Sequence, residues 1–504
     1  MRIYFCVLLI LFLVTRLFLI DKIPGSLYWD EASIGYNAYS VLKTGADEWG
    51  EKLPLSFKAF EEYKLPIFIY STIPFIATFG LDIFSIRLTS VLYSFFCLVL
   101  LILIIRKVTG NEKMAFLTGL FFTTSPWLFI FSRSAYEVNA GLFFYALGIY
   151  LYLIREKFKG LFFISILSFV VSIYSYNSFR IITPITLLFL FLNYILKRRI
   201  NKKILIIGIT VVIIGFLPIF LNKGATARFQ QVSFYNLTIS KPENIKSFLK
   251  NYLLHFSPKF LLLKGDINSR SQIPNFGQLS VVQFILFLMG VVYIFRQKDR
   301  KLLPLIFLLL IAPVPAAITR ESPHALRAIL MAPVIAVIAS IGAFSLKDLR
   351  LFKIIYPLII ALELLLFINY FSNFLHSYNN LTASDWQYGY KAIYDQYKNR
   401  FSNYDHVIIS DHYDQPYIFF LFYNQYDPTD FRKRVVFNST IRRSTSLVNK
   451  IDKFEFKSVD YYTFPSGKDI VFAHPSEKLS EMESSSVIYN PNGTVAFYVY
   501  DFTK

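Results

Sequence analysis

Residues 86–113 read IRLTSVLYSFFCLVLLILIIRKVTGNEK, in which an apolar run of 20 residues, 86–105, is followed by a short basic stretch, 106–113. A helix that crosses the hydrocarbon layer of a bilayer needs about 20 predominantly apolar residues. Lys and Arg gather in the cytoplasmic loops of membrane proteins. We therefore predict that 86–105 spans a membrane and that 106–113 lies on its cytoplasmic side.

The same pattern recurs along the chain and predicts an α-helical polytopic membrane protein with about eleven transmembrane helices. The predicted spans are 4–20, 86–105, 114–131, 138–154, 161–176, 181–196, 204–221, 279–295, 303–318, 326–344 and 354–371. Segment 4–20 resembles a signal peptide, but no small-residue cleavage site follows it, so we predict a retained first helix. Segment 66–80 is short and carries Pro66 and Pro74, and we predict an interfacial or re-entrant helix there.

The basic residues of the connections predict the orientation. Every second connection carries at least three of them: 106–113, 155–160, 197–203, 296–302 and 345–353. These connections and the N-terminus are predicted to be cytoplasmic. The connections 21–85, 132–137, 177–180, 222–278 and 319–325 then face outward, as does everything after residue 371. The expected location is the plasma membrane, with residues 1–371 as a transmembrane module.

The composition argues against other classes of protein. The chain is 55% hydrophobic and 17% charged, whereas soluble domains carry about 25% charged residues. Its net charge of +19 comes largely from short runs between apolar stretches, so no nucleic-acid partner is expected. Cys6 and Cys97 both lie in apolar segments and form no disulfide framework.

After about Phe371 the sequence becomes polar, and residues 372–504 are predicted to form an extracytoplasmic α/β domain. Residues 384–400 have a helical pattern, and 406–410, 434–437 and 495–501 have strand patterns. The role of this domain is not readable from its sequence.

The first outer connection is acidic in an otherwise basic protein, with eight acidic and five basic residues over 21–66. Within it, Asp30 and Glu31 open a helical stretch, 32–43. Carboxylates at a helix start are favoured by the helix dipole, so one interpretation is a helix cap. The other is a general base near the membrane surface, because a partly desolvated carboxylate beside a second one is suited to proton abstraction.

Several cations lie on the predicted outer side, against the usual bias. They are Lys64, Arg87, Arg133, Arg180, Arg320 and Arg327. A single arginine near the outer face can simply reach the headgroups. Several such cations with carboxylates between them favour an anion site, and a phosphate at membrane depth usually belongs to a lipid.

Other polar residues on the same side are weaker candidates. Glu137 can pair with Arg133 or bind substrate, and Asp266, Arg270 and Gln278 lie in a turn-rich stretch that is either a mobile lid or a polar linker. His324 is either a hydrogen-bond donor to substrate or a cap. The six histidines show no paired metal spacing, and no nucleotide-binding glycine loop is present.

Several motifs together resemble the GT-C superfamily of glycosyltransferases, in particular bacterial relatives of protein O-mannosyltransferases and of the lipid A aminoarabinose transferase. They are YWDEASIGYNAYSVLKTGADEWG, EYKLPIFIY, SIRL, SRSAYEVNAGLFF, YSYNSFR, GDINSRSQIPNFGQL and ESPHALRA. The resemblance extends to about residue 344, and the acidic pair is its most specific element.

The resemblance implies an inverting transfer of a sugar from a polyprenyl-phosphate donor of the undecaprenyl type to an acceptor hydroxyl. It makes Asp30 the catalytic base with Glu31 supporting it. Lys64 becomes a ligand of the carrier phosphate, although the family has Lys-Pro-Pro where this chain has Lys-Leu-Pro. The reaction needs no cofactor; a divalent cation held by Asp30, Glu31 and Glu137 is the alternative.

Two other functions remain open from the sequence. A transporter or flippase of polyprenyl-linked glycans also needs many spans and an anion site, although it predicts polar residues near the midplane and often inverted repeats. A non-enzymatic assembly or receptor protein would use the acidic loop only as a contact surface. The sugar, the acceptor and the oligomeric state are not readable from the sequence.

Overall fold

The computed structural model describes residues 2–60, 62–158, 160–196, 202–221, 233, 241–297, 302–438, 446–459, 467–479 and 482–503. Most of the predicted inner connections 197–203 and 296–302 fall outside these residues, as does most of 222–240. The chain divides into two compact units. The helical unit comprises Met1–Phe18 and Ser90–Phe374, and the mixed unit comprises Leu19–Thr89 and Leu375–Lys504.

This division differs from the sequence-based one, because it groups the first outer connection with the C-terminal residues. Two long helices, α4 (Ile83–Thr109) and α17 (Phe352–Thr382), contribute residues to both units. The assignment of 1–371 and 372–504 to separate functional modules stays a prediction.

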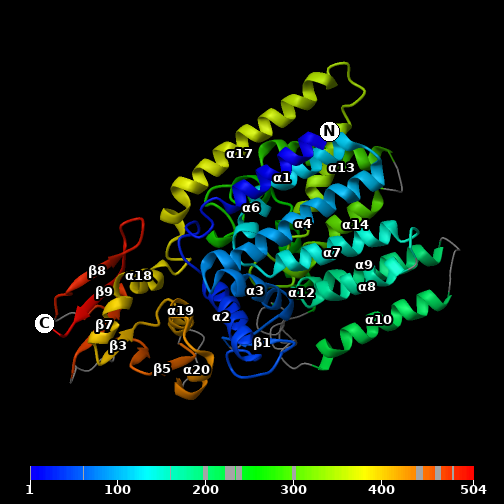
Figure 1. The fold of residues 1–504 in the computed structure, drawn as a ribbon. Coiled ribbons are helices and arrows are strands. Elements are labelled where there is room, and N and C mark those ends of the chain that lie inside the picture. Colours follow the sequence, from blue (N-terminus) through cyan, green and yellow to red (C-terminus); the bar gives the residue numbers. More distant parts are fainter. Residues whose placement is uncertain are drawn as a thin grey trace. The chain divides into compact units, whose positions relative to one another are not determined.

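The helical unit consists mostly of apolar helices (Figure 1). Besides parts of α4 and α17, its helices are α1 (Arg2–Leu17), α5 (Glu112–Thr124), α6 (Pro126–Arg133), α7 (Val138–Ile154), α8 (Gly160–Ile173), α9 (Phe179–Leu196), α10 (Lys202–Leu221), α12 (Lys241–Leu254), α13 (Val281–Gln297), α14 (Leu303–Ile311), α15 (Val314–Ala317) and α16 (Met331–Phe344). A π-helical turn, η1 (Lys259–Leu263), and a 3-10 turn, η2 (Ser269–Ser271), lie between α12 and α13.

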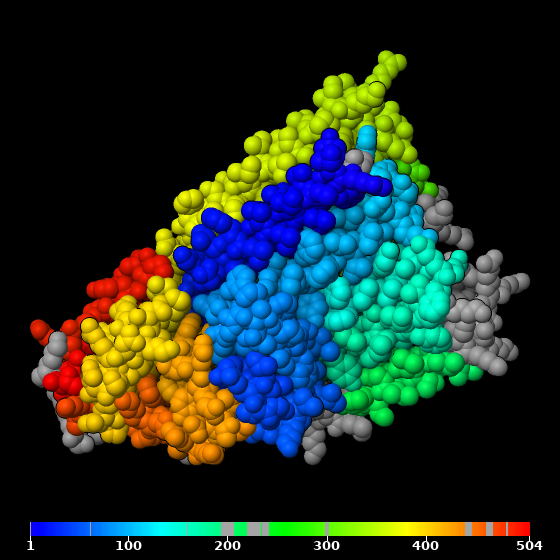
Figure 2. All heavy atoms as spheres, in the orientation of Figure 1, coloured from blue at the N-terminus to red at the C-terminus, as the bar shows by residue number. Residues whose placement is uncertain are grey.

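Exposed apolar surface indicates that these helices face lipid. In α1 the side chains of Ile3, Val7, Ile10 and Val14 are exposed and follow one helical face, and α1 lies open on the face of the molecule in Figure 2. Among the described residues, α4 and α17 are long and apolar enough to cross a membrane, and α5 with α6 makes a third span if counted as one. The chain is thus a membrane protein, whereas its count of eleven spans stays a prediction.

One predicted straight helix is wrong, because it is bent. The prediction of one helix over 114–131 misses a bend of 61° between α5 and α6. Pro126 follows the bend, and a proline ring blocks the backbone hydrogen bond that would continue the helix. The predicted helix 303–318 corresponds to the apolar helix Leu303–Ala317, which α14 and α15 form with Pro313 between them.

A buried carboxyl group joins the elements around the bend between α5 and α6. Glu363 of α17 accepts hydrogen bonds from Thr124 Oγ1 at the end of α5 (2.6 Å) and from Gln283 Nε2 of α13 (2.7 Å). Its second oxygen accepts one from Ser280 Oγ (2.6 Å). Three donors therefore satisfy this intramembrane carboxyl group, as burial in an apolar environment requires.

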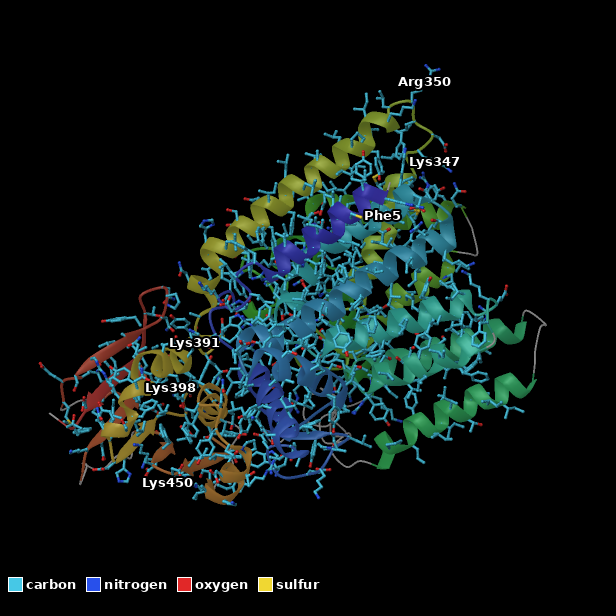
Figure 3. All side chains as sticks on the ribbon, viewed as in Figure 1. Phe5, Lys347, Arg350, Lys391, Lys398 and Lys450 are labelled. Atoms are coloured by element: carbon cyan, nitrogen blue, oxygen red, sulfur yellow. The ribbon has the colours of Figure 1, made fainter. Side chains whose placement is uncertain are left out.

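The basic connection 345–353 lies at one end of the helical unit. Lys347 and Arg350 project from this end in Figure 3. Both side chains are exposed, as expected for a connection that lies in water.

The mixed unit begins with α2 (Trp29–Thr44), a hairpin of β1 (Phe57–Ala59) and β2 (Glu62–Lys64), and α3 (Pro66–Phe79), followed by the start of α4. The remaining elements are α18 (Tyr388–Tyr397), η3 (Lys398–Asn403), β3 (His406–Ile409), α19 (Pro416–Tyr423), α20 (Pro428–Arg434), β4 (Val435–Phe437), β5 (Val448–Ile451), β6 (Phe454–Phe456), β7 (Asp469–Ala473), η4 (Pro475–Glu477), β8 (Ser486–Tyr489) and β9 (Val495–Asp501).

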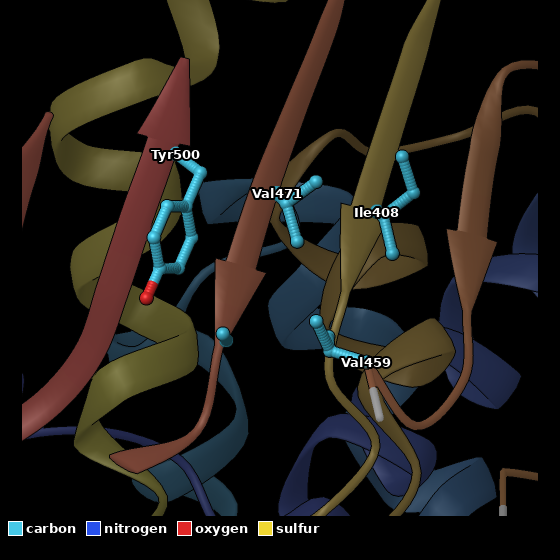
Figure 4. Packing of buried hydrophobic residues seen from close by; sticks show 5 residues of the cluster. Ile408, Val459, Val471 and Tyr500 are labelled. Atoms are coloured by element: carbon cyan, nitrogen blue, oxygen red, sulfur yellow. The ribbon is translucent and has the colours of Figure 1, made fainter. Parts of the chain in front are cut away.

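These strands form a seven-stranded mixed sheet of order β4-β5-β6-β3-β7-β9-β8. β3 pairs in parallel with β6 and β7, and the other pairs are antiparallel. Ile408, Val459, Val471, Ala473 and Tyr500 form a buried cluster on this sheet (Figure 4). The prediction of a C-terminal domain with helices and strands is confirmed, with 384–400 divided into α18 and η3.

Candidate active site

The acidic pair lies in the first turn of α2, as the sequence indicates. Glu31 occupies the third helical position, and its Oε2 accepts the backbone N–H of Tyr28 at 3.3 Å. An acceptor at this position satisfies one of the N–H groups that a helix start leaves without a partner. Glu31 therefore has the helix-capping role that was one of the two interpretations of the pair.

Glu31 also forms a buried ion pair with Arg87. The two residues join through Arg87 Nε to Glu31 Oε1 (3.1 Å) and Arg87 Nη2 to Glu31 Oε2 (3.0 Å). The remaining donors of Arg87 bind the backbone carbonyls of Ile20, Pro24 and Ser26 at 2.6–2.9 Å. Since a guanidinium has five N–H groups, Arg87 uses all of them within the mixed unit. It has none left for a phosphate in this structure.

Asp30 has a different environment from its neighbour. Its side chain is 47% exposed and forms an ion pair with Lys64, whose side chain is only 6% exposed. Lys64 ends β2, and its backbone pairs with Phe57 of β1. The hairpin thus brings a buried cation to a carboxylate that solvent and ligands can reach.

Aromatic side chains surround this ion pair. The rings of Trp29 and Phe60 stack at 5.5 Å, and Lys64 Nζ lies 5.8 Å from the centroid of Phe60. The backbone N–H of Trp29 donates to Gln387 Oε1 at 2.9 Å, which fixes the first residue of α2 to the C-terminal part of the mixed unit. Aromatic rings beside an accessible carboxylate are suited to contact a sugar or a lipid chain.

In the helical unit, Arg133 is fully buried at the end of α6. It donates to the carbonyls of Thr15 (2.6 Å), Arg16 (2.9 Å) and Phe18 (2.8 Å). These carbonyls belong to the last turn of α1 and the residue after it, where backbone acceptors lack helical partners. This geometry gives Arg133 a capping role at the end of α1.

Asp266 organises the turn-rich stretch before α13. Its Oδ2 accepts the N–H of Ala325 at 2.7 Å and lies 3.7 Å from His324 Nδ1, while Oδ1 accepts the N–H of Asn268 at 3.0 Å. Burial raises the pKa of Asp266. His324 in turn donates its backbone N–H to His255 Nε2 at 3.1 Å, and burial lowers the pKa of His255 to about 4. These bonds fasten the stretch to residues 324–325.

The other predicted residues lie at loops and helix ends. Arg327 Nη1 donates to Thr319 Oγ1 (2.8 Å), and Nη2 lies 3.7 Å from Glu321. Arg270 lies in η2, which Asn268 caps. Glu137 precedes α7 and Arg180 is the second residue of α9, and both are half-buried.

The structure therefore brings together Asp30 with Lys64, Glu31 with Arg87, and Asp266 with His324, the first two pairs in the mixed unit and the third in the helical unit. Within the part of the chain that the structure describes, no three His, Cys, Asp or Glu side chains form a group that could hold a metal ion. As ligands of a substrate, all these residues remain predictions.

Sequence reasoning missed several buried charged residues, among them Arg16, Glu48 and Glu363. Arg16 and Glu363 stand out in retrospect, because each is a single charge inside an apolar run. Arg16 donates to Thr123 O at 2.6 Å and lies 4.6 Å from the ring centroids of Phe12 and Phe129. Glu48 gives no such signal, because it lies in a polar loop.

Comparison with solved structures identifies the fold. ArnT from Cupriavidus metallidurans bound to undecaprenyl phosphate matches with a TM-score of 0.56 and 12% identity, over 99% of this chain and 97% of that one. Its apo state matches with a TM-score of 0.57 over the same shares. The oligosaccharyltransferase AglB from Archaeoglobus fulgidus, in complex with an inhibitory peptide and a dolichol-phosphate, matches with a TM-score of 0.50 and 13% identity, over 82% of this chain and 63% of that one.

No protein-family model and no curated protein sequence matches this chain. The resemblance to GT-C glycosyltransferases that the motifs indicate is confirmed at the level of the fold, and over nearly the whole chain. It includes the C-terminal residues, to which the motif resemblance did not extend.

Proposed function

We propose that this protein is a membrane glycosyltransferase that moves a sugar from a polyprenyl-phosphate donor to an acceptor hydroxyl on the outer membrane face, with inversion. The observation that carries the proposal is the Asp30–Lys64 pair, which places an accessible carboxylate beside a buried cation at the start of α2. The likeness of the fold to ArnT bound to undecaprenyl phosphate supports it.

In the proposed reaction Asp30 removes the proton of the acceptor hydroxyl, whose oxygen attacks the anomeric carbon of the sugar. The bond between that carbon and the phosphate oxygen breaks, and the polyprenyl phosphate leaves with the electron pair. Lys64 stabilises the negative charge that develops on the leaving phosphate, and its burial strengthens this effect. Glu31 and Arg87 hold the first turn of α2 in place and so orient Asp30.

The comparison of cells with and without the gene tests this proposal. We expect mass spectrometry of their envelope glycans and lipids to find one sugar modification that disappears with the gene and returns with the wild-type chain. The same measurement names the sugar and its acceptor. If the modification stays and polyprenyl-linked sugar accumulates on the cytoplasmic side instead, the chain is a flippase and the proposal is wrong.

A further inference from the structure

Glu48 is a fully buried carboxyl group to which the proposed reaction assigns no role. It lies in the loop that follows α2, which ends at Gly45 (φ +70°). Asp47 shapes this loop, because its Oδ1 accepts the N–H groups of Trp49 (2.9 Å) and Glu51 (2.8 Å). The next side chain, Glu48, is turned to the inside of the mixed unit, with an exposed fraction of 0%.

Asn37 of α2 binds Glu48 by two reciprocal hydrogen bonds. Asn37 Nδ2 donates to Glu48 Oε1 at 3.1 Å, and the backbone N–H of Glu48 donates to Asn37 Oδ1 at 3.1 Å. Asn37 follows Asp30 by seven residues, which is about two helical turns. Glu48 is therefore held against the face of α2 that carries Asp30, and Asp30 in turn binds Lys64.

The second oxygen of Glu48 has no hydrogen-bond partner among the described residues, and neither has Asp47 Oδ2. An ionised carboxylate in such a place is costly. Burial raises the pKa of Glu48 to about 8, Asp47 acts in the same direction, and Asn37, Lys64 and Lys58 act against it. At neutral pH the carboxyl group is thus largely protonated.

Among the described residues, three further charged or titratable groups, each from a different helix, lie around Glu48 or the loop that carries it. They are Tyr36 of α2, Tyr417 of α19 and Arg432 of α20. Arg432 donates to the backbone carbonyl of Asp47 at 2.7 Å and to Ser40 and Thr44 of α2, both at 2.9 Å. Burial raises the pKa values of both tyrosines, and the cations that lower the pKa of Glu48 are Lys64 and Lys58.

We propose that Glu48 is a positioning residue that leaves Lys64 free to bind the phosphate of a polyprenyl-phosphate donor while its own carboxyl group is protonated, and that weakens this binding when it ionises. The proposal rests on the proposed function. Since Lys64 acts on the pKa of Glu48, an ionised Glu48 would attract Lys64 in competition with the phosphate and would repel the phosphate. A neutral carboxyl group does neither.

The test measures the binding of polyprenyl monophosphate, without a sugar, to the purified full-length chain between pH 7 and pH 9. We expect the affinity of the wild type to fall by about tenfold over this range, as expected for a group with a pKa near 8 that blocks binding when ionised. The affinity of Glu48→Gln should stay nearly constant. Glu51→Gln, an exposed carboxylate in the same loop, should follow the wild type. The ionisation of the phosphate itself affects all three proteins alike.

Glu48→Met, which is neutral and of similar length, is the second variant and should give the same flat profile even if Glu48→Gln folds poorly. The proposal is overturned if these variants show the pH dependence of the wild type. If the wild type binds no polyprenyl phosphate at any pH, both this inference and the proposed function fail. If binding depends on Glu48 as expected and no sugar is transferred, only the proposed function fails.

Discussion

At the scale of single residues, burial and hydrogen bonding separate groups that look alike in the sequence. Arg87 and Arg133 are both candidates for the predicted anion site, which stays a prediction. In this structure their guanidinium groups bind backbone carbonyls and, for Arg87, Glu31. Lys64 differs because its partner, Asp30, is half-exposed. The sequence locates a cation against the positive-inside bias, but it does not reveal whether a carbonyl or a ligand will satisfy that cation.

Replacement of Arg87 should therefore impair folding more than it impairs chemistry. We expect Arg87→Gln to lower the free energy of unfolding by about 3–5 kcal/mol, the usual cost when one partner of a buried ion pair is removed. Thermal unfolding in detergent measures this loss. Arg400→Gln, at an exposed position, is the control and should unfold like the wild type. A stable Arg87→Gln chain that has lost only lipid binding would contradict the structural role.

Glu48 also makes stability depend on pH. Its pKa is raised from 4.5 to about 8 by burial, so the folded chain holds the proton more tightly than the unfolded chain does. This contribution to stability is complete below pH 4.5 and is lost as the pH rises through about 8. We expect Glu48→Gln to show a smaller fall in Tm than the wild type between pH 6 and pH 9, with Glu51→Gln as the control. Parallel curves for Glu48→Gln and the wild type would exclude this effect.

At the scale of elements, apolar runs locate the helices but not their interruptions. The predicted span 138–154 coincides with α7, and 86–105 lies within α4. The break at Ser125 escaped prediction, since prolines are tolerated inside transmembrane helices where neighbouring groups satisfy the freed backbone. The contacts of Glu363 with Thr124, Ser280 and Gln283 supply such neighbours at this break.

Close packing of α13 on α16 depends on two glycines. A Cβ atom at Gly342 would lie 1.9 Å from Leu286 O, and one at Gly290 would lie 2.0 Å from Ile338 O. Small residues of this kind allow the backbones of membrane helices to approach each other. We expect Gly342→Ala to force the helices apart and to lower Tm by several degrees, because overpacking costs about 1–3 kcal/mol. Ala361→Val, at an exposed position on α17, should leave Tm nearly unchanged. Equal Tm values for the two variants would contradict this packing.

At the scale of the whole molecule, the charge bias predicts an orientation that labelling can test. In a chain with Cys6 and Cys97 replaced by serine, we expect Ser402→Cys to react with a membrane-impermeant maleimide in intact cells. Lys347→Cys should react only after the membrane is opened. Both positions are exposed to solvent. The reverse pattern would put the candidate active site on the cytoplasmic side and rule out the proposed outer-face reaction.

The sequence predicted the fold class well, but it did not predict which candidate site residues pair with each other, for a physical reason. The length of an apolar run, the charge of a connection and a strand pattern are local properties of the sequence. Together they located most helices as well as β3, β4 and β9. The strands β1, β2, β5, β6, β7 and β8 were missed, because these short segments owe their conformation to pairing with a neighbouring strand rather than to local pattern. Asp30 and Lys64 are 34 residues apart, and only the β1–β2 hairpin brings them together.

The account depends most on Asp30, and one measurement tests it directly. The wild type, Asp30→Asn and Asp385→Asn would each be purified and reconstituted in proteoliposomes with a polyprenyl-phosphate sugar and extracted acceptor. The release of polyprenyl phosphate would then be followed for each protein. We expect Asp30→Asn to bind the lipid but to release polyprenyl phosphate at least 100-fold more slowly than the wild type, because a general base contributes about 10²–10⁴-fold to the rate. The control variant, Asp385→Asn, should keep the wild-type rate. Release by Asp30→Asn at the wild-type rate would contradict the assignment of Asp30 as the base.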